Sequence, residues 1–584
     1  MIQYCIMNPH KIFIEYTHNN TNRFFTTDIS SQEDTSGDDI LKARYSLKDG
    51  RFILALFPSS KVTVRQVMVS GEIVTPRKSR TRYFLNGYQS WTDSREYTSN
   101  EVEKTVGHMP DFINKKFGFE SYGDYTFCGK KLSKGNYHGW TYAYAKLGDD
   151  YEFIGSLSEL AGESARIIPE AKKSYAFALI KFFTKENKFE VYADADGIEY
   201  EISEPVEMLD VVFLSGTEDG VFDNYFKLAG IEKPKSEPVV GWTSWYDFYQ
   251  DINEKCLMEN IQGLSENGSN PFRVFQIDDG YEPFVGDWLS VDEKKFPNGL
   301  EPITKAAKEK GMKTGIWFAP FSAEKKSKIF KDHPDWFMKD ESGKPVLCGC
   351  NWSGFYGMDI YNEEVREYII RSCRHFIDDL GFTLLKIDFL YSVCLVPRKD
   401  KTRGQVMHDA LVFFREASKG AELLGCGVPL GSAFGLVDYC RIGTDVSLSW
   451  DDKLYMQLCH RERPSTKNTI LNSLYRRQLD GRAFLNDPDV FLLRTYNEKL
   501  GTERKALLSR INAIAGSLVF TSDNPSSYNH EQKTELEKVV KLTKAKIRTV
   551  ESNRNKISIF YDPLDGENGE SVLRFNRKNG KMRK

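Results

Sequence analysis

Residues 272–281 read Phe-Arg-Val-Phe-Gln-Ile-Asp-Asp-Gly-Tyr, a short apolar run that stops at two acids and a glycine. Such a run is typical of a strand buried on both faces of a parallel sheet. The same pattern recurs through the second half of the chain. We find eight such runs, at residues 239–245, 272–278, 313–320, 383–389, 424–429, 439–445, 483–487 and 516–522.

Segments with helical spacing lie between these runs. Apolar side chains recur every three or four residues over 300–310, 363–379, 405–423 and 503–515. Strand-then-helix units repeated eight times predict a (β/α)8 TIM barrel, which carries its catalytic groups at the carboxyl ends of the strands. A doubly wound open sheet is the alternative, although no glycine-rich phosphate loop follows the first run.

The chain before this pattern alternates apolar and polar residues, as over 61–65 and 188–192. Turn-forming residues separate the runs at 148–150 and 194–197. We therefore predict an N-terminal β-sandwich over residues 1–235. A polar boundary segment with two prolines, residues 230–238, leads into the predicted barrel.

We place the barrel at residues 236–530 and a short C-terminal β domain at 531–584. The last part opens with a helical pattern around 532–544. It ends in two alternating runs, 556–560 and 571–575, separated by the turn-rich stretch 565–569.

Composition excludes several classes of protein. A chain of 584 residues with 40% hydrophobic residues and a net charge of −3 is neither a single small fold nor disordered. Nucleic acid is not an expected partner, because binding it needs a concentrated positive surface. No run of about 18 apolar residues occurs, so we expect no membrane span.

Localisation and cofactors are also bounded by the sequence. Residues 1–16 lack the pattern of an export signal, and ten scattered cysteines fit reduced thiols, so we expect a cytoplasmic protein. Cys348 and Cys350 form the only tight cysteine pair, without the further ligands that tetrahedral zinc needs. We therefore expect no metal and no other cofactor.

Polar and aromatic side chains stand where the apolar runs stop. These residues are Trp242, Trp245, Asp278, Asp279, Trp317, Lys386, Asp388, Cys426, Arg441, Asp445, Asp487, Asp489 and Asp523. A single aspartate there is often a helix cap, but caps do not explain tryptophan and lysine at the same depth. Carboxylates with tryptophans favour carbohydrate chemistry, because aromatic faces pack on sugar C–H groups and carboxylates hold hydroxyls. No Gly-x-Ser-x-Gly elbow supports a serine hydrolase.

The chain resembles the α-galactosidases of glycoside hydrolase family 36, the melibiases, in their compact bacterial form. The resemblance spans roughly residues 80–525 and rests on motifs that occur in the family's order. They are Gly-Trp-Thr-Ser-Trp-Tyr at 241–246, Phe-Gln-Ile-Asp-Asp-Gly-Tyr at 275–281, Gly-Asp-Trp-Leu at 286–289, Gly-Ile-Trp-Phe-Ala-Pro-Phe at 315–321, His-Pro-Asp-Trp at 333–336, Lys-Ile-Asp-Phe-Leu at 386–390, Arg-Ile-Gly-Thr-Asp at 441–445 and Leu-Asn-Asp-Pro-Asp at 485–489.

This resemblance implies a retaining exo-α-galactosidase that acts on α-galactoside oligosaccharides, with Asp388 as nucleophile and Asp445 as general acid/base. A retaining pair needs carboxyl groups about 5 to 5.5 Å apart, against about 6.5 to 9.5 Å for inversion. Lys386 lies two residues before Asp388 on the same strand face, so we expect its charge to lower the pKa of that carboxyl. Around Asp445 we expect fewer cations or more burial.

Other positions match the family's sugar-binding residues. Asp278 and Asp279 stand where the family grips the 4- and 6-hydroxyls, and both can reach the sugar only if the strand ends at or before Asp279. The remaining matches are Trp317 near the sugar, Lys386, Cys426 and Arg441 around the pocket, Trp245 beneath it, and Trp91 within Asn-Gly-Tyr-Gln-Ser-Trp at 86–91, a loop of the sandwich that covers the site.

Alternatives stay open at this point. The segment Cys426-Gly-Val-Pro-Leu-Gly431 departs from the glycine-rich form of many members. Because this region faces the sugar's 2-substituent in relatives, an α-N-acetylgalactosaminidase is one alternative. A raffinose-synthase-like transglycosylase with the same carboxylates is another, and a sugar-binding module that kept the barrel is a third. The sequence does not indicate the oligomeric state.

Overall fold

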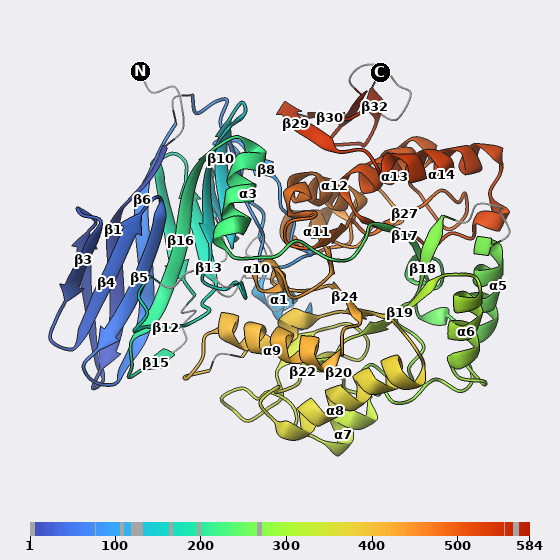
Figure 1. Cartoon of the computed structure of the whole chain (residues 1–584), viewed down its shortest axis with the longest axis horizontal. Coiled ribbons are helices and arrows are strands. Elements are labelled where there is room, and N and C mark those ends of the chain that lie inside the picture. The colour runs from blue at the N-terminus through green and yellow to red at the C-terminus, as the bar shows by residue number, and fades with distance from the viewer. Residues whose placement is uncertain are drawn as a thin grey trace.

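A computed structural model describes residues 6–75, 77–105, 110–117, 119, 132–162, 167–194, 200–265, 271–396, 398–553, 555–563 and 571–583. Figure 1 shows a layered β structure at the N-terminal end of the molecule, a parallel sheet with helices around it at the other end, and a small sheet beside the C-terminus. No helix in the described ranges has both the length and the apolar content that a bilayer crossing requires.

Two antiparallel sheets form the N-terminal part. The first has the order β2 (Thr21–Asp28), β1 (Ile6–His18), β6 (Val62–Val74), β14 (Lys188–Ala193), β13 (Ala178–Phe183) and β9 (Asn136–Trp140), with β15 (Tyr200–Ile202) also on β6. The second has the order β3 (Glu33–Gly37), β4 (Leu41–Lys48), β5 (Arg51–Pro58), β16 (Val206–Gly216), β11 (Asp150–Ser156), β10 (Tyr142–Leu147), β7 (Arg82–Leu85) and β8 (Glu96–Tyr97), with β12 (Lys172–Lys173) on β16.

The predicted alternation accounts for these strands. The runs at 61–65 and 188–192 lie in β6 and β14, and their inward side chains, such as Val64 and Val191, belong to one buried apolar cluster. The predicted turn at 148–150 joins β10 to β11, where Leu147 pairs with Asp150. Most of the other predicted turn, residues 195–197, lies outside the described ranges.

The eight predicted barrel runs overlap the strands of one sheet, in which neighbouring strands pair in parallel. Its order is β26 (Leu485–Asp487), β25 (Tyr439–Arg441), β24 (Glu422–Gly425), β23 (Leu384–Ile387), β19 (Lys313–Phe318), β18 (Phe272–Ile277), β17 (Val239–Thr243), β28 (Leu518–Thr521) and β27 (Val490–Phe491). Neighbours follow the chain order and the last run pairs beside the first, whereas a doubly wound sheet reverses its order at a switch point.

The two ends of this sheet are halves of one strand. β26 pairs with β25 and β27 pairs with β28, and only Pro488 and Asp489 separate β26 from β27. Proline cannot donate to a ladder, and Asp489 has a positive φ of 72°, so the strand breaks here. The sheet therefore returns to its starting point through the chain itself.

Helices connect the strands, largely where the sequence predicts them. They include α3 (Glu218–Leu228), α4 (Trp245–Phe248), α5 (Glu254–Ser265), α6 (Glu301–Glu309), α7 (Lys328–Asp332), α8 (Glu363–Arg374), α9 (Arg403–Ala417), α10 (Leu430–Ala433), α11 (Leu454–Cys459), α12 (Thr466–Tyr475), α13 (Thr502–Ala515) and α14 (His530–Leu542). The helix predicted over 405–423 is too long. It ends at Ala417 because Lys419 and Gly420 adopt positive φ values of 49° and 84°, and Leu423 belongs to β24.

Two smaller sheets complete the fold. A sheet of β20 (Ser322–Glu324), β22 (Phe355–Gly357) and β21 (Leu347–Gly349) follows β19 and was not predicted. The C-terminal sheet contains the two predicted runs as β30 (Lys556–Tyr561) and β31 (Ser571–Asn576), with β29 (Ile547–Asn553) and β32 (Met582–Arg583) beside them. The predicted turn at 565–569 lies outside the described ranges.

Candidate active site

A cavity of about 360 Å³ opens where the strands of the parallel sheet end. This volume falls within the range of small-molecule sites. Asp388 and Asp445 both line it, so the two carboxyls share one cavity. Its walls are Trp91, Phe119, Trp245, Gln250, Asp278, Asp279, Trp317, Asn351, Trp352, Lys386, Asp388, Phe389, Asp445, His460, Glu462 and Pro464.

Asp388 directly follows β23 and is held from two sides. The indole Nε1 of Trp317 donates to its Oδ2 at 3.0 Å, and the backbone N–H of Phe389 donates to its Oδ1 at 2.7 Å. Phe389 adopts a left-handed conformation with φ of 53°, which is costly for an aromatic residue. This strained turn and the indole fix the carboxylate at the strand end.

Burial dominates the electrostatics of Asp388. The carboxyl is 7% exposed, and its pKa is raised above the ordinary value because burial outweighs the opposing charge of Lys386 and the two hydrogen bonds. The predicted effect of Lys386 therefore has the right sign, but it is not the larger effect. Lys386 itself makes its ion pair with Asp278, Nζ to Oδ2 at 2.7 Å.

Asp445 lies in a different setting, four residues beyond the end of β25. Its Oδ1 accepts a hydrogen bond from Nη2 of Arg441 at 2.9 Å, and 38% of its side chain is exposed. The expectation of fewer cations or more burial around Asp445 is wrong. Asp388 is the more buried carboxyl, and Asp445 has the direct cationic contact, because the loop carries it away from the strand ends.

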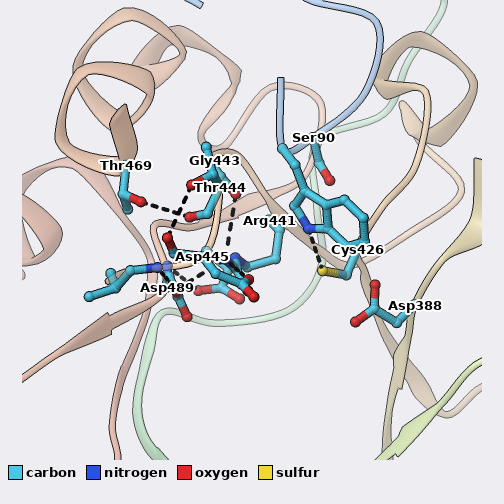
Figure 2. Close-up of polar contacts among 12 residues, drawn as sticks. Ser90, Asp388, Cys426, Arg441, Gly443, Thr444, Asp445, Thr469 and Asp489 are labelled. Carbon is cyan, nitrogen blue, oxygen red and sulfur yellow. Dashed lines mark hydrogen bonds and ion pairs between the residues drawn. The ribbon is translucent and has the colours of Figure 1, made fainter. Parts of the chain in front are cut away.

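Arg441 bridges Asp445 to a second, buried carboxylate. Its Nη2 lies 3.1 Å from Oδ2 of Asp489, which also accepts the backbone N–H of Val446 at 2.7 Å and the hydroxyl of Tyr246. Figure 2 shows this cluster with Asp388 on the opposite side of the view. Arg441 does not line the cavity, so it acts on the site through Asp445. Asp489 was expected at a strand end but was given no role in the predicted site, and the break between β26 and β27 places it here.

Asp278 and Asp279 both reach the cavity because β18 ends at Ile277. Asp279 accepts the indole N–H of Trp352 at 2.8 Å and the amide of Gln250 at 3.1 Å. Burial raises the pKa of Asp279, and burial together with the charge of Asp279 raises that of the neighbouring Glu282 well above its usual range. A proton shared by this buried carboxyl pair leaves one negative charge instead of two.

The N-terminal part of the chain supplies one wall of the cavity through residues 86–94, which we call the Trp91 loop. The indole N–H of Trp91 donates to Sγ of Cys426 at 3.2 Å. Cys426 therefore lies behind Trp91 and not in the cavity wall. A Cβ on Gly427 would lie 3.0 Å from Cη2 of Trp91, so the indole packs tightly on the end of β24.

Arg476 of α12 anchors this loop. The guanidinium is fully buried and donates to the Asn86 side chain at 2.9 Å, to the carbonyl of Ser90 at 2.6 Å, and to the carbonyl of Ile442, directly after β25, at 2.9 Å. Burial lowers its pKa to about 10, which still leaves it charged at neutral pH. Carbonyl oxygens from both parts of the chain thus converge on one cation and hold Trp91 at the cavity.

Of the predicted site residues, Trp91, Trp245, Asp278, Asp279, Trp317, Lys386, Asp388 and Asp445 line the cavity, while Cys426 and Arg441 lie behind it. Further residues line the cavity that the sequence did not predict for the site, namely Phe119, Gln250, Asn351, Trp352, Phe389, His460, Glu462 and Pro464. Trp352 is held between β21 and β22 with φ of 54°, a placement for which the sequence offered no periodic signal. Within the described residues, no three His, Cys, Asp or Glu side chains are arranged to hold a metal ion.

Residues 227–413 match the family model described as Melibiase, which confirms the predicted resemblance over this segment. The α-galactosidase Mel36A of Lactobacillus acidophilus is 29% identical over 169 residues, 28% of this chain and 22% of that protein. An α-galactosidase of Escherichia coli is 33% identical over 102 residues, 16% of this chain and 14% of that protein. The aligned segments thus span less than a quarter of either relative.

Solved structures extend the likeness to nearly the whole chain. The α-galactosidase TtGalA from Thermus thermophilus, in complex with p-nitrophenyl α-D-galactopyranoside, has a TM-score of 0.67 and 24% identity, covering 88% of this chain and 97% of that one. The family 36 α-galactosidase AgaA from Geobacillus stearothermophilus has a TM-score of 0.59 and 11% identity, covering 98% and 79%. At these identities the superpositions establish a common fold.

Proposed function

We propose, from the premise that this chain is a melibiase relative of the glycoside hydrolase family 36 type, that it is a retaining exo-α-galactosidase. It hydrolyses terminal α-linked galactose from oligosaccharides by double displacement. The observation that carries the proposal is that Asp388 and Asp445 line one cavity of about 360 Å³ together with tryptophans and two further aspartates.

In the first step, a carboxylate oxygen of Asp388 attacks the anomeric carbon as the glycosidic C–O bond breaks. Asp445 donates its proton to the departing oxygen, which leaves a galactosyl ester on Asp388. In the second step, Asp445 takes a proton from water, whose oxygen attacks the same carbon and breaks the ester. Two inversions restore the α configuration, and both carboxyls return to their starting states.

The settings of the two residues suit these roles. Trp317 and the Phe389 backbone hold Asp388 without covering the cavity side, so it can attack with little rearrangement. Asp445 is partly exposed and lies on a loop, which gives the leaving group and then water access to its carboxyl. Asp278 and Asp279 are placed to accept hydrogen bonds from sugar hydroxyls.

The packing of Trp91 favours galactose over N-acetylgalactosamine. In relatives the end of the fifth strand faces the 2-substituent, and here the indole fills that side against Cys426 and Gly427. An acetamido group would have to displace this indole.

We also propose the domain division predicted from the sequence, with a sandwich over 1–235, a (β/α)8 barrel over 236–530 and a C-terminal domain over 531–584. Each sheet that the structure describes lies within one of these three ranges, which supports the proposed division. The return of the parallel sheet through β26 and β27 supports a closed barrel.

NMR spectroscopy of the products tests the proposed function. We expect p-nitrophenyl α-galactoside and melibiose to release α-galactose first, with water as the main acceptor, and the 2-acetamido analogue to react far more slowly. Release of β-galactose would exclude the double displacement. Preference for the 2-acetamido analogue, or transfer mainly to sugar, would favour the galactosaminidase or the transglycosylase instead.

A further inference from the structure

A second cavity of about 150 Å³ lies behind one wall of the first. His460 lines both cavities, so a single side chain separates them at this point. The smaller cavity, which we call the basic pocket, is lined by Asp93, Arg95, Tyr97, Lys104, Gln457, His460, Arg461, Arg463, Lys467 and Asn468. Five of these residues are lysine or arginine and one is an acid.

The dividing wall, residues 460–464, presents alternate side chains to the two sides. Glu462 and Pro464 line the proposed catalytic cavity, and Arg461 and Arg463 line the basic pocket. Burial and the charge of Arg463 lower the pKa of His460 to about 3, so its ring is neutral. The positive charge of the pocket therefore comes from its lysines and arginines alone.

All three arginines of the pocket have carboxylate partners, and Arg95 lies 3.8 Å from Asp93. Arg463 lies 3.1 Å from Asp451, and Arg461 lies 3.3 Å from Glu103. Within the part of the chain that the structure describes, Lys467 forms its ion pair with Asp451, at 3.5 Å, and it shares this carboxylate with Arg463. The pocket thus holds more positive charge than its neighbouring acids neutralise.

Several hydrogen-bond donors around the pocket are unused. Within the described residues, Nδ2 of Asn468 and Nε of Arg95 are buried without a hydrogen-bond partner, and Asn468 is 1% exposed. Lys104 makes no hydrogen bond or ion pair in the same ranges, and Arg95 is 3.8 Å from Asp93, beyond hydrogen-bond distance. Buried donors without partners are costly, so a ligand that accepts from them would be stabilised.

We propose that the basic pocket binds a tetrahedral oxyanion of the phosphate class. The donors of the pocket come from three places, Arg95 before β8, Lys104 in the following loop, and Lys467 with Asn468 in the first turn of α12. A group with oxygens in several directions can accept from all of them, whereas a planar carboxylate presents two oxygens. The positive end of the α12 dipole adds to the attraction.

The ligand has two possible sources, free phosphate or a phosphate ester on the leaving-group side of a galactoside. The second source rests on the proposed function. Two hydrogen bonds support this second source, because they join the loop of Asp445 to the dividing wall. The carbonyl of Asp445 accepts the Ser465 N–H at 2.8 Å, and the Thr444 hydroxyl donates to the carbonyl of Arg463 at 2.8 Å. The loop of the proposed acid and the pocket are thus hydrogen-bonded neighbours.

Calorimetric titration with inorganic phosphate, in low-salt buffer without other oxyanions, tests the pocket without any turnover. We expect saturable binding to the full-length protein that galactose does not displace. Lys467→Met and Lys104→Met should each weaken it about tenfold or more, the usual effect of losing one charge-assisted contact. Lys453→Met, which removes an exposed lysine outside the pocket, should leave it unchanged.

Kinetics distinguish the sources. If the ligand is a phosphate ester, kcat/KM for melibiose phosphorylated on its glucose unit should exceed that for melibiose at least tenfold, and Lys104→Met should abolish this preference. Equal rates together with phosphate binding would assign the pocket to free phosphate. The proposal is overturned if phosphate does not bind and the phosphorylated sugar has no advantage, or if binding survives both lysine substitutions. An inactive enzyme that still binds phosphate would contradict only the proposed function.

Discussion

The carboxyl at the end of β23 and the carboxyl beyond β25 differ in how the fold holds them. Asp388 is the first residue after its strand, buried and fixed by an indole and a backbone N–H. Asp445 is four residues past its strand, partly exposed, and held by a buried arginine. The sheet sets the position of Asp388, whereas a loop and its hydrogen bond to Arg441 set the position of Asp445.

This difference suits the two tasks that we propose for these residues, nucleophile for Asp388 and general acid/base for Asp445. A nucleophile gains from a fixed position, because the reacting atoms must meet within a narrow range of geometry. A general acid that later acts as base must meet two partners, a leaving group and a water, so access matters as much as position. The comparison predicts that substitutions at the two sites fail in different ways.

The largest effect should follow Asp388→Asn. Loss of the nucleophile should lower kcat by about 10⁴-fold or more on both melibiose and p-nitrophenyl α-galactoside, because no other group can form the ester. Steady-state rates on the two substrates measure this. Asp335→Asn, at an exposed aspartate, is the control and should retain normal rates. Substantial activity of Asp388→Asn would remove its proposed role and the comparison with it.

Asp445→Asn should give a smaller and more selective loss. We expect kcat/KM to fall by about 10² to 10⁴-fold on melibiose, whose leaving group needs a proton. The loss on p-nitrophenyl α-galactoside should be much smaller, because nitrophenolate departs without one. Equal losses on the two substrates would show that Asp445 does not act as the acid.

Arg476→Met tests the anchor that joins the Trp91 loop to α12. Removing the buried guanidinium leaves several carbonyls without donors, so we expect the free energy of unfolding to fall by about 3 kcal/mol or more. Urea denaturation measures this fall. Arg548→Met, at an exposed ion pair, should cost less than about 1 kcal/mol. Similar losses in both variants would mean that the anchor contributes little.

Lys386→Met should shift the pH profile by the smallest amount. Asp388 must be ionised to attack, so activity is lost as the pH falls through its raised pKa. The charge of Lys386 lowers the pKa of Asp388, so removing this charge should raise that pKa further. The acid limb of the kcat/KM profile should then move to higher pH by about one unit. Lys328→Met, at an exposed lysine, should not move the limb. If the acid limb of Lys386→Met stays at the same pH, the charge of Lys386 stabilises Asp278 and does not affect the pKa of Asp388.

Most of the parallel sheet could be predicted from the sequence because buried parallel strands are continuous apolar runs. Each of the eight predicted runs overlaps a strand of this sheet, although the run 424–429 shares only residues 424 and 425 with β24. Catalytic groups of such folds lie at the carboxyl ends of the strands, which predicts that Asp388 and Asp445 lie close together, and both line one cavity. The setting of Asp445 could not be predicted in this way, since its four-residue offset from β25 depends on the path of a loop.

Loop residues were the main omission. Trp352 and His460 reach the cavity from segments with no periodic pattern, and their placement depends on contacts with distant residues. Asp489 was expected at a strand end, but its contact with Arg441 depends on the break of the strand at Pro488. The ion pair of Lys386 with Asp278 could not be predicted, because it depends on the register between β18 and β23, which are not adjacent in the sheet.

The attachment of Arg476 to the Trp91 loop bears on how such proteins can be recombined. A gene fragment starting near residue 236 would encode the parallel sheet with one wall of its cavity missing, and Arg476, which is buried in the full chain, would face water. Chimaeras built from two relatives should therefore exchange residues 86–94 and 461–476 as a unit. A crossover between these segments would combine Arg476 of one relative with the Trp91 loop of the other, whose oxygens accept its hydrogen bonds.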